Sequence, residues 1–340
     1  MKTWMIVSVI ACFIIGLTAG CSDQSAFSSG NAEGGNIQTP LKRAAIEDKY
    51  VTIVTGGTSG VYFQLGNALA KEYGEKLGAR ASAQTTGASV ENIEKIHRKQ
   101  AELGFAMADI VGDAYEGKGT FSNVGPLQNL ASIASLYPNY MQIVTTKKSG
   151  IKTLQDIKGK RVAVGAIGSG TEIMTRQILE GVGLTYNDVK ADFLSFAEGV
   201  EGIKHATIDV AFLSSGYPNA GIMDLAETHD IYLIPIPNEL TEKLKKQHPS
   251  YSYSTIPANT YKGVTKAVAT ITANNILITH KDMTDDEVYE LTKTLFENID
   301  TLHSTHSSAQ QIKLETAAYG LPIPLHPGAA RYYTEKNVWP

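Results

Sequence analysis

The chain has 340 residues, of which 43% are hydrophobic, and a formal net charge of −4. This length allows two domains of ordinary size, and the nearly balanced charge provides no basic field of the kind that binds nucleic acid. Both cysteines, Cys12 and Cys21, precede residue 22. Residues 22–340 therefore cannot hold a cysteine nucleophile, an iron–sulfur cluster or a cysteine-type zinc site.

The N-terminal segment has the layout of a bacterial lipoprotein signal. Lys2 is followed by an apolar run and then by small residues before Cys21. We therefore predict a signal peptide over residues 1–20 and lipidation of Cys21, with residues 21–45, rich in Ser, Gly and Asn, as a flexible tether. An uncleaved membrane helix is the alternative, but the apolar run is short for a span. The protein is expected to be extracytoplasmic, in the periplasm or on the outer face of the cytoplasmic membrane, and held to the membrane by its lipid anchor.

The first half of the body alternates between strands and helices. Apolar periodicity changes from strand to helix spacing at glycine-containing turns, and Gly78 is placed to end the first helix. In chain order the pattern predicts a strand over 50–55, a helix over 61–77, a strand over 79–87, a helix over 90–101 that Ser89 caps, and a buried strand over 103–109.

The same order recurs about 110 residues further along the chain. Residues 161–183 again read as strand, glycine turn and helix, and they are followed by a strand over 190–196, a helix over 198–207 and a strand over 208–216. Between the halves, 127–159 is predicted to hold two apolar strands, one of them crossing between lobes. Residues 261–283 look like a return strand, and Thr284 is expected to cap the next helix. The sequence thus predicts two similar α/β halves with glycine and hydroxyl turns at the carboxyl ends of strands.

The first glycine turn, residues 56–60, matches no catalytic or nucleotide motif. It is not G-x-G-x-x-G, it lacks the Gly-Lys-Ser/Thr of a phosphate loop, and it is not the G-x-S-x-G of a hydrolase elbow. One such turn alone can be a plain connection between a strand and a helix. Several at the same topological position favour a binding site, because backbone N–H groups at helix starts attract anions.

Two single residues leave alternatives open. Asp109, predicted to end a core strand, could be a base, a helix cap or an acceptor that positions a ligand. Tyr137, near the predicted crossing between lobes, could be a core aromatic or part of a cleft wall.

Taken together, the motifs resemble those of the TAXI family, the extracytoplasmic solute receptors of one branch of the TRAP transporters. The resemblance rests on "TGGTSGVYFQLGNALA", "TTGASVENI", "ELGFAMADI", "VAVGAIGSGTE", "SSGYPNA" and "GLPIPLHPGAARYY", which follow the family's order over residues 48–336. It implies an α/β, two-lobed periplasmic-binding-protein fold, type II-like, with the ligand cleft between lobes joined by hinge strands. Lobe 1 would comprise 46–140 plus 257–340, and lobe 2 would comprise 141–256.

The resemblance also implies a function. The protein would capture a small carboxylate solute, such as glutamate, glutamine or 2-oxoglutarate, by hinge closure and deliver it to an integral membrane TRAP permease. No catalytic residue, cofactor or metal is expected. The alternatives are a secreted hydrolase or transferase that uses Ser59 or Ser169, and a ligand-sensing receptor. Neither serine has a recognisable motif that carries a general base.

The ligand-binding residues implied by the resemblance come from turns in both lobes, with Tyr137 added as a possible cleft wall. They are Gly56, Gly57, Thr58, Ser59, Gly60, Tyr62, Thr86, Gly87, Ala88, Ser89, Asn92, Asp109, Tyr137, Ser169, Gly170, Thr171, Ser214, Ser215 and Gly216. The N–H groups of Gly57–Gly60 would hold the carboxylate at the start of the following helix. The second turn reads Gly87-Ala88-Ser89, where two glycines are frequent in the family, so the space above it should be slightly narrower.

Overall fold

The computed structural model describes residues 44–339. The predicted signal peptide, the predicted lipidation site Cys21 and nearly all of the predicted tether lie outside the described residues. Within the described part, no helix is both long enough and apolar enough to span a bilayer.

One mixed ten-stranded sheet organises the described chain, in the order β2-β1-β3-β10-β4-β7-β5-β6, with β8 paired to β4 and β9 paired to β10. Strand β1 is parallel to β2 and β3, and β5 is parallel to β6 and β7. The order 2-1-3 on one side is therefore mirrored by 6-5-7 on the other. The strands are β1 Tyr50–Val54, β2 Arg80–Gln84, β3 Leu103–Met107, β4 Leu130–Thr146, β5 Arg161–Ala163, β6 Lys190–Asp192, β7 Val210–Ser215, β8 Ile231–Leu233, β9 Ser252–Ile256 and β10 Val268–His280.

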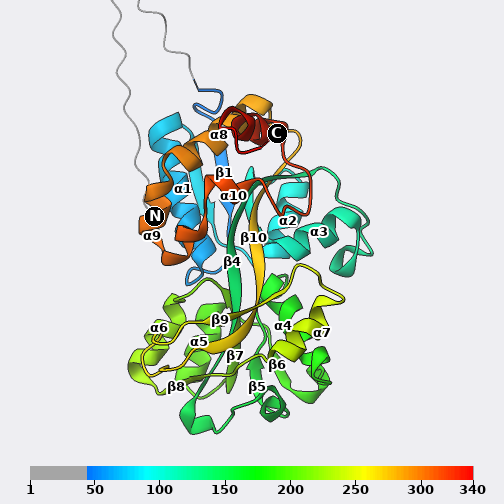
Figure 1. The fold of residues 1–340 in the computed structure, drawn as a ribbon, viewed down its shortest axis with the longest axis vertical. Helices are drawn as coiled ribbons and strands as arrows, with labels where there is room; N and C mark the ends of the chain where they lie inside the picture. The colour runs from blue at the N-terminus through cyan, green and yellow to red at the C-terminus, as the bar shows by residue number, and fades with distance from the viewer. Residues whose placement is uncertain (1–43, 340) are drawn as a thin grey trace, which may run out of the picture. The chain divides into compact units, whose positions relative to one another are not determined.

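The helices fall into two groups, one around each end of this sheet (Figure 1). We call the group that contains α1–α3 and α8–α11 the first lobe, and the group that contains α4–α7 the second lobe. The helices are α1 Val61–Leu77, α2 Ser89–His97, α3 Ala108–Glu116, α4 Gly170–Gly181, α5 Phe196–Lys204, α6 Ala220–Thr228, α7 Asn238–Lys245, α8 Asp285–Glu297, α9 Ile299–Thr305, α10 Leu314–Ala317 and α11 Pro327–Glu335.

Two long antiparallel strands, β4 and β10, run from one lobe into the other (Figure 1). The return strand predicted within 261–283 is confirmed as β10. The prediction of two strands within 127–159 is wrong, because β4 is one continuous strand of 17 residues. Pro138 lies within this strand, where the register between β4 and β10 shifts, and proline is tolerated at such an irregularity.

The first glycine turn and its helix form as predicted. Helix α1 has the predicted bounds, and Gly78 ends it with a left-handed φ of 67°. Thr284 caps α8 in a capping box with Glu287. These elements depend on local interactions, which the sequence shows directly.

Several predicted boundaries are wrong. Ser89 does not cap α2 but is its first residue, and the N-cap is Ala88. Helix α2 ends at His97 rather than at residue 101. Strand β3 ends at Met107, so Asp109 lies in the first turn of α3 and does not end a strand. Phe196 begins α5 instead of ending a strand, because Ser195 and Glu198 form a capping box that starts the helix there.

The apolar core is continuous from one lobe to the other. One cluster of buried side chains includes Ile93 and Met107 of the first lobe as well as Ile173 and Phe212 of the second. A separate cluster packs α1, α8 and α11 within the first lobe, and another lies within the second. The carboxyl ends of β1, β3, β5 and β7 thereby point toward the junction of the lobes.

Candidate functional site

A cavity lies at the junction of the two lobes and has a volume of about 560 Å³, including the solvent at its mouth. Backbone turns and helix starts from both lobes form its wall. The lining residues are Gly56, Gly57, Gly60, Val61, Tyr62, Thr86, Gly87, Ala88, Ser89, Met107, Tyr137, Asn139, Ala166, Ser169, Gly170, Thr171, Ser195, Phe196, Ser214 and Ser215.

The start of α1 is the most open group of backbone donors in this wall. Gly60 is its N-cap, with no side-chain hydrogen bond to the first turn, and the first turn carries no acidic residue. The first N–H groups of a helix have no partner within the helix and carry the positive end of its dipole. The start of α1 can therefore accept an anion.

Three other helix starts at the cavity, those of α2, α4 and α5, are already capped, and the start of α3, whose N-cap Met107 lines the cavity, carries the acidic Asp109 in its first turn. Gly168 O, from the second lobe, accepts hydrogen bonds from the N–H groups of Val90 and Glu91 at the start of α2, at 3.0 and 3.4 Å. Ser169 caps α4 and Ser195 caps α5. This distribution leaves α1 as the start best able to receive a ligand anion.

Three serine hydroxyls in or beside the wall accept hydrogen bonds from the protein. Ser89 Oγ accepts from Met107 N at 3.1 Å, Ser169 Oγ from Glu172 N at 3.0 Å, and Ser215 Oγ from the Asn219 side chain at 3.3 Å. A hydroxyl has one hydrogen and two lone pairs, so each of these serines still has a hydrogen to donate, and that of Ser89 lies within reach of the Tyr62 hydroxyl. The cavity therefore offers donors more readily than acceptors.

Tyr137 also lines the cavity. Its side chain is fully buried, and its OH has no hydrogen-bond partner. Burial raises the pKa of this phenol well above its usual range, so the hydroxyl keeps its proton. Asn275 of β10 fixes the surrounding polar groups by donating to Asn139 Oδ1 at 2.9 Å and to Tyr137 O at 2.8 Å, while it accepts from Tyr62 OH.

The structure brings most of the predicted site residues together on this wall. They are Gly56, Gly57, Gly60, Tyr62, Thr86, Gly87, Ala88, Ser89, Tyr137, Ser169, Gly170, Thr171, Ser214 and Ser215. The two glycine turns, 110 residues apart in the sequence, do face each other. For Tyr137, the two readings prove compatible, because the residue is both buried and part of the wall.

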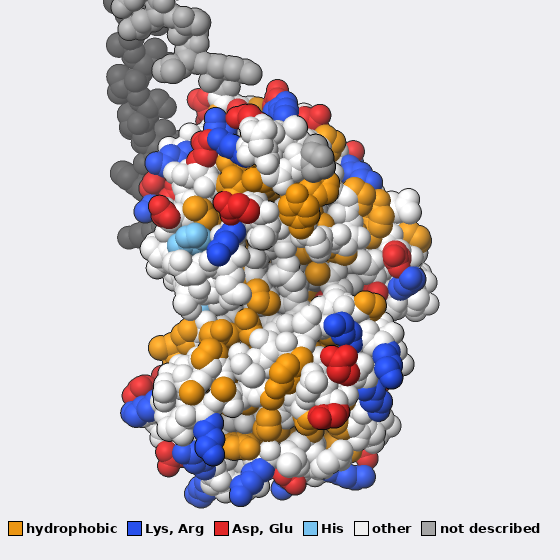
Figure 2. Space-filling model, in the orientation of Figure 1, with side chains coloured by type: hydrophobic (Ala, Val, Ile, Leu, Met, Phe, Trp, Pro, Cys, Tyr) orange, Lys and Arg blue, Asp and Glu red, His pale blue; other side chains and the backbone are white. Residues whose placement is uncertain are grey.

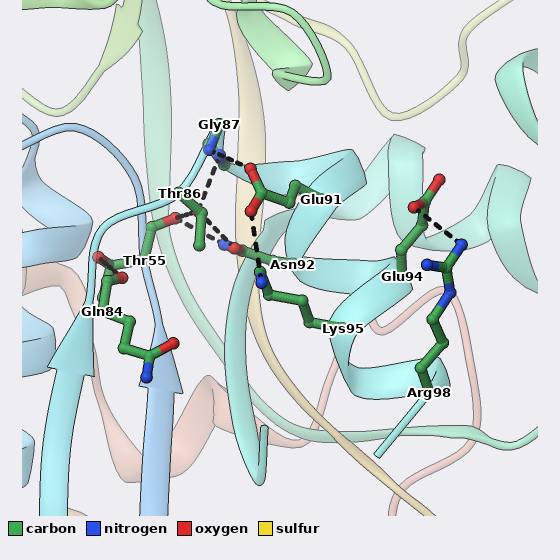
Figure 3. A network of polar contacts seen from close by, with 10 residues as sticks. Thr55, Gln84, Thr86, Gly87, Glu91, Asn92, Glu94, Lys95 and Arg98 are labelled. Atoms are coloured by element: carbon green, nitrogen blue, oxygen red, sulfur yellow. Dashed lines mark hydrogen bonds and ion pairs between the residues drawn. The ribbon is translucent and has the colours of Figure 1, made fainter. Parts of the chain in front are cut away.

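Five predicted residues do not line the cavity, and one of them, Asn92, supports it from behind. Asn92 Nδ2 donates to Thr55 O at 2.5 Å (Figure 3). It also donates to Phe105 O at 2.8 Å, which ties the ends of β1 and β3 together. Asn92 therefore positions the turn and has no free group for a ligand. Thr58 is exposed to solvent.

The other three lie where the lobes meet. Ser59 O accepts a hydrogen bond from Asn219 Nδ2 at 3.3 Å. Gly216 packs so closely against Ser308 of the first lobe that an added Cβ would overlap it. Asp109 Oδ2 accepts a hydrogen bond from Tyr251 OH at 3.1 Å. These residues take part in closing the lobes over the cavity.

Sequence reasoning missed part of the wall. The missed residues are Val61, Met107, Asn139, Ala166, Ser195 and Phe196. Asn139 and Met107 lie in strands predicted to be buried, where the sequence does not show which face meets the cavity. Ser195 was detectable, because the S-x-x-E spacing to Glu198 is a capping-box signature.

The lobes contact each other on both sides of the cavity, so the structure shows a closed arrangement. On one side, His306 Nε2 lies 3.0 Å from Pro218 O, and Ser307 Oγ donates to Tyr217 O at 3.0 Å. On the other, Gly168 O caps α2. Figure 3 shows how Glu91 turns back from α2 to the N–H of Gly87, a bond of 2.6 Å that holds this turn in place.

Charged side chains are absent from the lining of this cavity, all of which lies in the described residues. Figure 2 shows that, on the face drawn, most Lys, Arg, Asp and Glu side chains lie over the outer parts of the two lobes. Recognition of an anion here must therefore depend on neutral donors and helix dipoles, in a setting where little water weakens them.

Ala88 has an unfavourable backbone conformation at this site. Its φ of 76° and ψ of −138° fall in a region that glycine adopts readily and alanine does not. Such strain costs on the order of 1–3 kcal/mol. Replacing Ala88 by glycine would remove this strain, but glycine loses more backbone entropy on folding, which takes back about 0.5–1 kcal/mol of the gain.

Ala88→Gly is therefore expected to raise the free energy of unfolding by about 1 kcal/mol, measured by urea denaturation. The matched control is Ala68→Gly within α1, where helical geometry suits alanine and the same change should lower stability by about 1 kcal/mol. A loss of stability in Ala88→Gly comparable to that in the control would contradict the strain.

Comparison with known proteins identifies both a family and a fold. The model of the NMT1-like family matches residues 53–336. Among solved structures, PhnD1 from Prochlorococcus marinus (MIT 9301) in complex with methylphosphonate is similar, with 12% identity over 85% of this chain and 96% of that chain and a TM-score of 0.52. The periplasmic aliphatic sulphonate-binding protein SsuA from Escherichia coli matches with 13% identity over 86% and 84% of the two chains, at a TM-score of 0.42. The predicted α/β, two-lobed periplasmic-binding-protein fold is confirmed.

Proposed function

The chain belongs to the NMT1-like family, and we propose that it is an extracytoplasmic solute-binding receptor that captures a small organic anion between its lobes and delivers it to a membrane permease. The observation that supports this most is the cavity itself, which is enclosed by two lobes and lined by neutral donors around the start of α1. The protein would act by binding and closure, with no chemical step.

Hinge motion would take place in the strands that join the lobes. Strands β4 and β10 cross between them, and the predicted boundary at residue 140 falls inside β4. Bending of these strands would separate the contacts of Gly168 with α2 and of Pro218 with His306, and would open the cavity. The lobe assignment of 46–140 plus 257–340 and 141–256 fits this proposal.

In more detail, we propose a receptor of the TAXI type for a TRAP permease, with a small carboxylate as its solute. A carboxylate matches the free N–H groups at the start of α1, because charge-assisted hydrogen bonds contribute roughly 1.5–3 kcal/mol each and micromolar binding needs about 8 kcal/mol. The predicted lipid anchor at Cys21 would hold the receptor near its permease.

A second candidate is a receptor for a phosphonate or a sulfonate that serves an ABC-type transporter. The similarity in fold to PhnD1, a structure in complex with methylphosphonate, favours it. Such tetrahedral oxyanions accept hydrogen bonds from the same donors. The two candidate receptors differ in the headgroup of their ligand, a carboxylate or a tetrahedral oxyanion. Binding measurements with both kinds of ligand therefore distinguish them.

An enzyme that uses Ser59 or Ser169 has less support. Ser169 Oγ is the cap of α4, and Ser59 Oγ is buried with no hydrogen-bond partner, so neither has a general base beside it. A sensing receptor would use the same closure, and its partner rather than its site would distinguish it.

Isothermal titration calorimetry with the purified protein tests the proposal. The panel contains glutamate, glutamine, 2-oxoglutarate, methylphosphonate and a short alkanesulfonate. We expect micromolar binding of at least one carboxylate. Tight binding of only the phosphonate or the sulfonate would favour the second candidate, and silence across the panel would contradict a receptor for small organic anions.

A further inference from the structure

We propose that the cavity selects an anion that lacks an ammonium group, such as a 2-oxo or 2-hydroxy acid, over the corresponding amino acid, and that Tyr137 binds an acceptor atom of that ligand. This inference deepens the proposed function and rests on it. It follows from the balance of donors and acceptors in the wall and from the absence of a free carboxylate there.

The N–H and O–H donors of the wall need acceptor atoms, which a bound ligand would supply. The first turn of α1 has no cap, and the hydroxyls of Ser89 and Ser169 accept from backbone N–H groups and keep their own hydrogens. A carboxylate, an oxo group or a sulfonate brings only acceptors, which satisfies these groups. An ammonium group brings three donors and no acceptor.

The acidic side chains nearest the cavity are already engaged by the protein. Glu91 accepts from Gly87 N and pairs with Lys95 at 3.6 Å. Glu172 pairs with Arg176 at 3.4 Å.

Glu198 is also engaged, because it accepts from the backbone and the hydroxyl of Ser195, at 2.9 and 2.7 Å. Asp109 accepts from Tyr251 through Oδ2, while its Oδ1 is buried without a partner; this residue does not line the cavity. A buried ammonium would therefore lack a counter-ion, which is costly in an enclosed site.

Tyr137 provides the independent sign that a ligand atom is missing from this wall. Tyr137 lines the cavity, and its hydroxyl is fully buried and has no partner, although buried polar groups in folded proteins are nearly always paired. Because the phenol keeps its proton, it is suited to donate to an oxygen of the ligand beyond the group held at α1.

The test uses three pairs of ligands that differ only in one amino group: 2-oxoglutarate and glutamate, isethionate and taurine, methylphosphonate and aminomethylphosphonate. Dissociation constants are measured by calorimetry on the full chain. In every pair that binds, we expect the member without the amino group to bind at least roughly tenfold more tightly, because the ammonium is buried unpaired. Equal or tighter binding of the amino member would overturn the inference and leave the proposed receptor function intact. Silence of all six ligands would overturn the receptor function itself.

Tyr137→Phe tests the contact at the hydroxyl. It should weaken the tightest ligand about fivefold, which corresponds to one neutral hydrogen bond. Tyr73→Phe is the matched control, because Tyr73 is also fully buried with an unpartnered OH but lies on the core-facing side of α1 and not at the cavity. An unchanged affinity in Tyr137→Phe, or an equal loss in Tyr73→Phe, would overturn the assignment of Tyr137.

Discussion

Gly87→Ala is expected to weaken ligand binding at least roughly 100-fold, or about 2.7 kcal/mol, while the ligand-free protein stays as stable as the wild type. A Cβ on Gly87 would lie 2.7 Å from the carbonyl oxygen of Ile167 in the opposite lobe. Both are parts of turns that face each other, and Gly168 O caps α2 next to this contact. The added methyl would therefore prevent the closed arrangement. The open form should accept it, since within the first lobe the nearest group is the flexible side chain of Glu91.

The matched control is Gly57→Ala. Gly57 also faces the second lobe, and an added Cβ there would lie 3.8 Å from Ser195 Cβ, an ordinary contact. Neither glycine has a positive φ, so alanine strains neither backbone, and both variants keep the N–H group. Gly57→Ala should lose far less affinity than Gly87→Ala. Calorimetry gives the affinities, and thermal melts of the ligand-free variants give their stabilities. Near-normal binding by Gly87→Ala would mean that closure does not bring Gly87 against Ile167.

This contrast also shows what the sequence could and could not predict about the site. The turns at Gly56–Gly60 and Gly165–Ser169 were visible because glycine and hydroxyl residues between a strand and a helix form a local signal. The sequence does not reveal which of these glycines must lack a side chain. This depends on how closely the second lobe approaches, and only the folded chain shows that Ile167 reaches Gly87 and not Gly57.

Residues outside the turns illustrate a second limit. Asn92 follows a turn and has an amide that suits ligand binding, but the ends of β1 and β3 use both of its donors. Asn139 lies within the continuous strand β4 and reaches the cavity because Asn275 of β10 orients it. A pairing between residues 136 positions apart leaves no trace in local periodicity, which is why the crossing strands, and the wall they form, were the least predictable part.

The last prediction concerns the junction where Asp109 meets Tyr251. Tyr251 OH lies 3.1 Å from Asp109 Oδ2 and 2.5 Å from Gln177 Oε1 on α4. One phenol hydrogen cannot serve both acceptors. The carboxylate form of Asp109 accepts from Tyr251, as described above, but a protonated Asp109 would donate to Tyr251 and so leave the phenol hydrogen for Gln177.

The pKa of Asp109 agrees with this geometry. The pKa of its carboxyl group is raised to about 6: burial is the main cause and the nearby Asp113 contributes, against the opposing hydrogen bonds from Tyr251 and the backbone. Opening of the lobes would expose Asp109 and return its pKa to about 4. Closure should therefore take up a proton between about pH 4 and pH 6, so the closed, ligand-bound state gains stability as the pH falls through 6.

The expected result is that the dissociation constant of the wild type becomes about 25-fold smaller between pH 7.5 and pH 4.5, with uptake of almost one proton on binding near pH 5. Asp109→Asn should remove this dependence and should bind at pH 7.5 about as tightly as the wild type does at low pH, because the amide donates to Tyr251 as the protonated acid would. Calorimetry in buffers of different ionisation enthalpy gives the number of protons taken up on binding. Any titration of the ligand itself also occurs with Asp109→Asn, so the difference between the two proteins isolates the contribution of Asp109. The same pH dependence in Asp109→Asn would assign the proton to another group. Weaker binding by the variant at every pH would mean that closure needs the charged carboxylate.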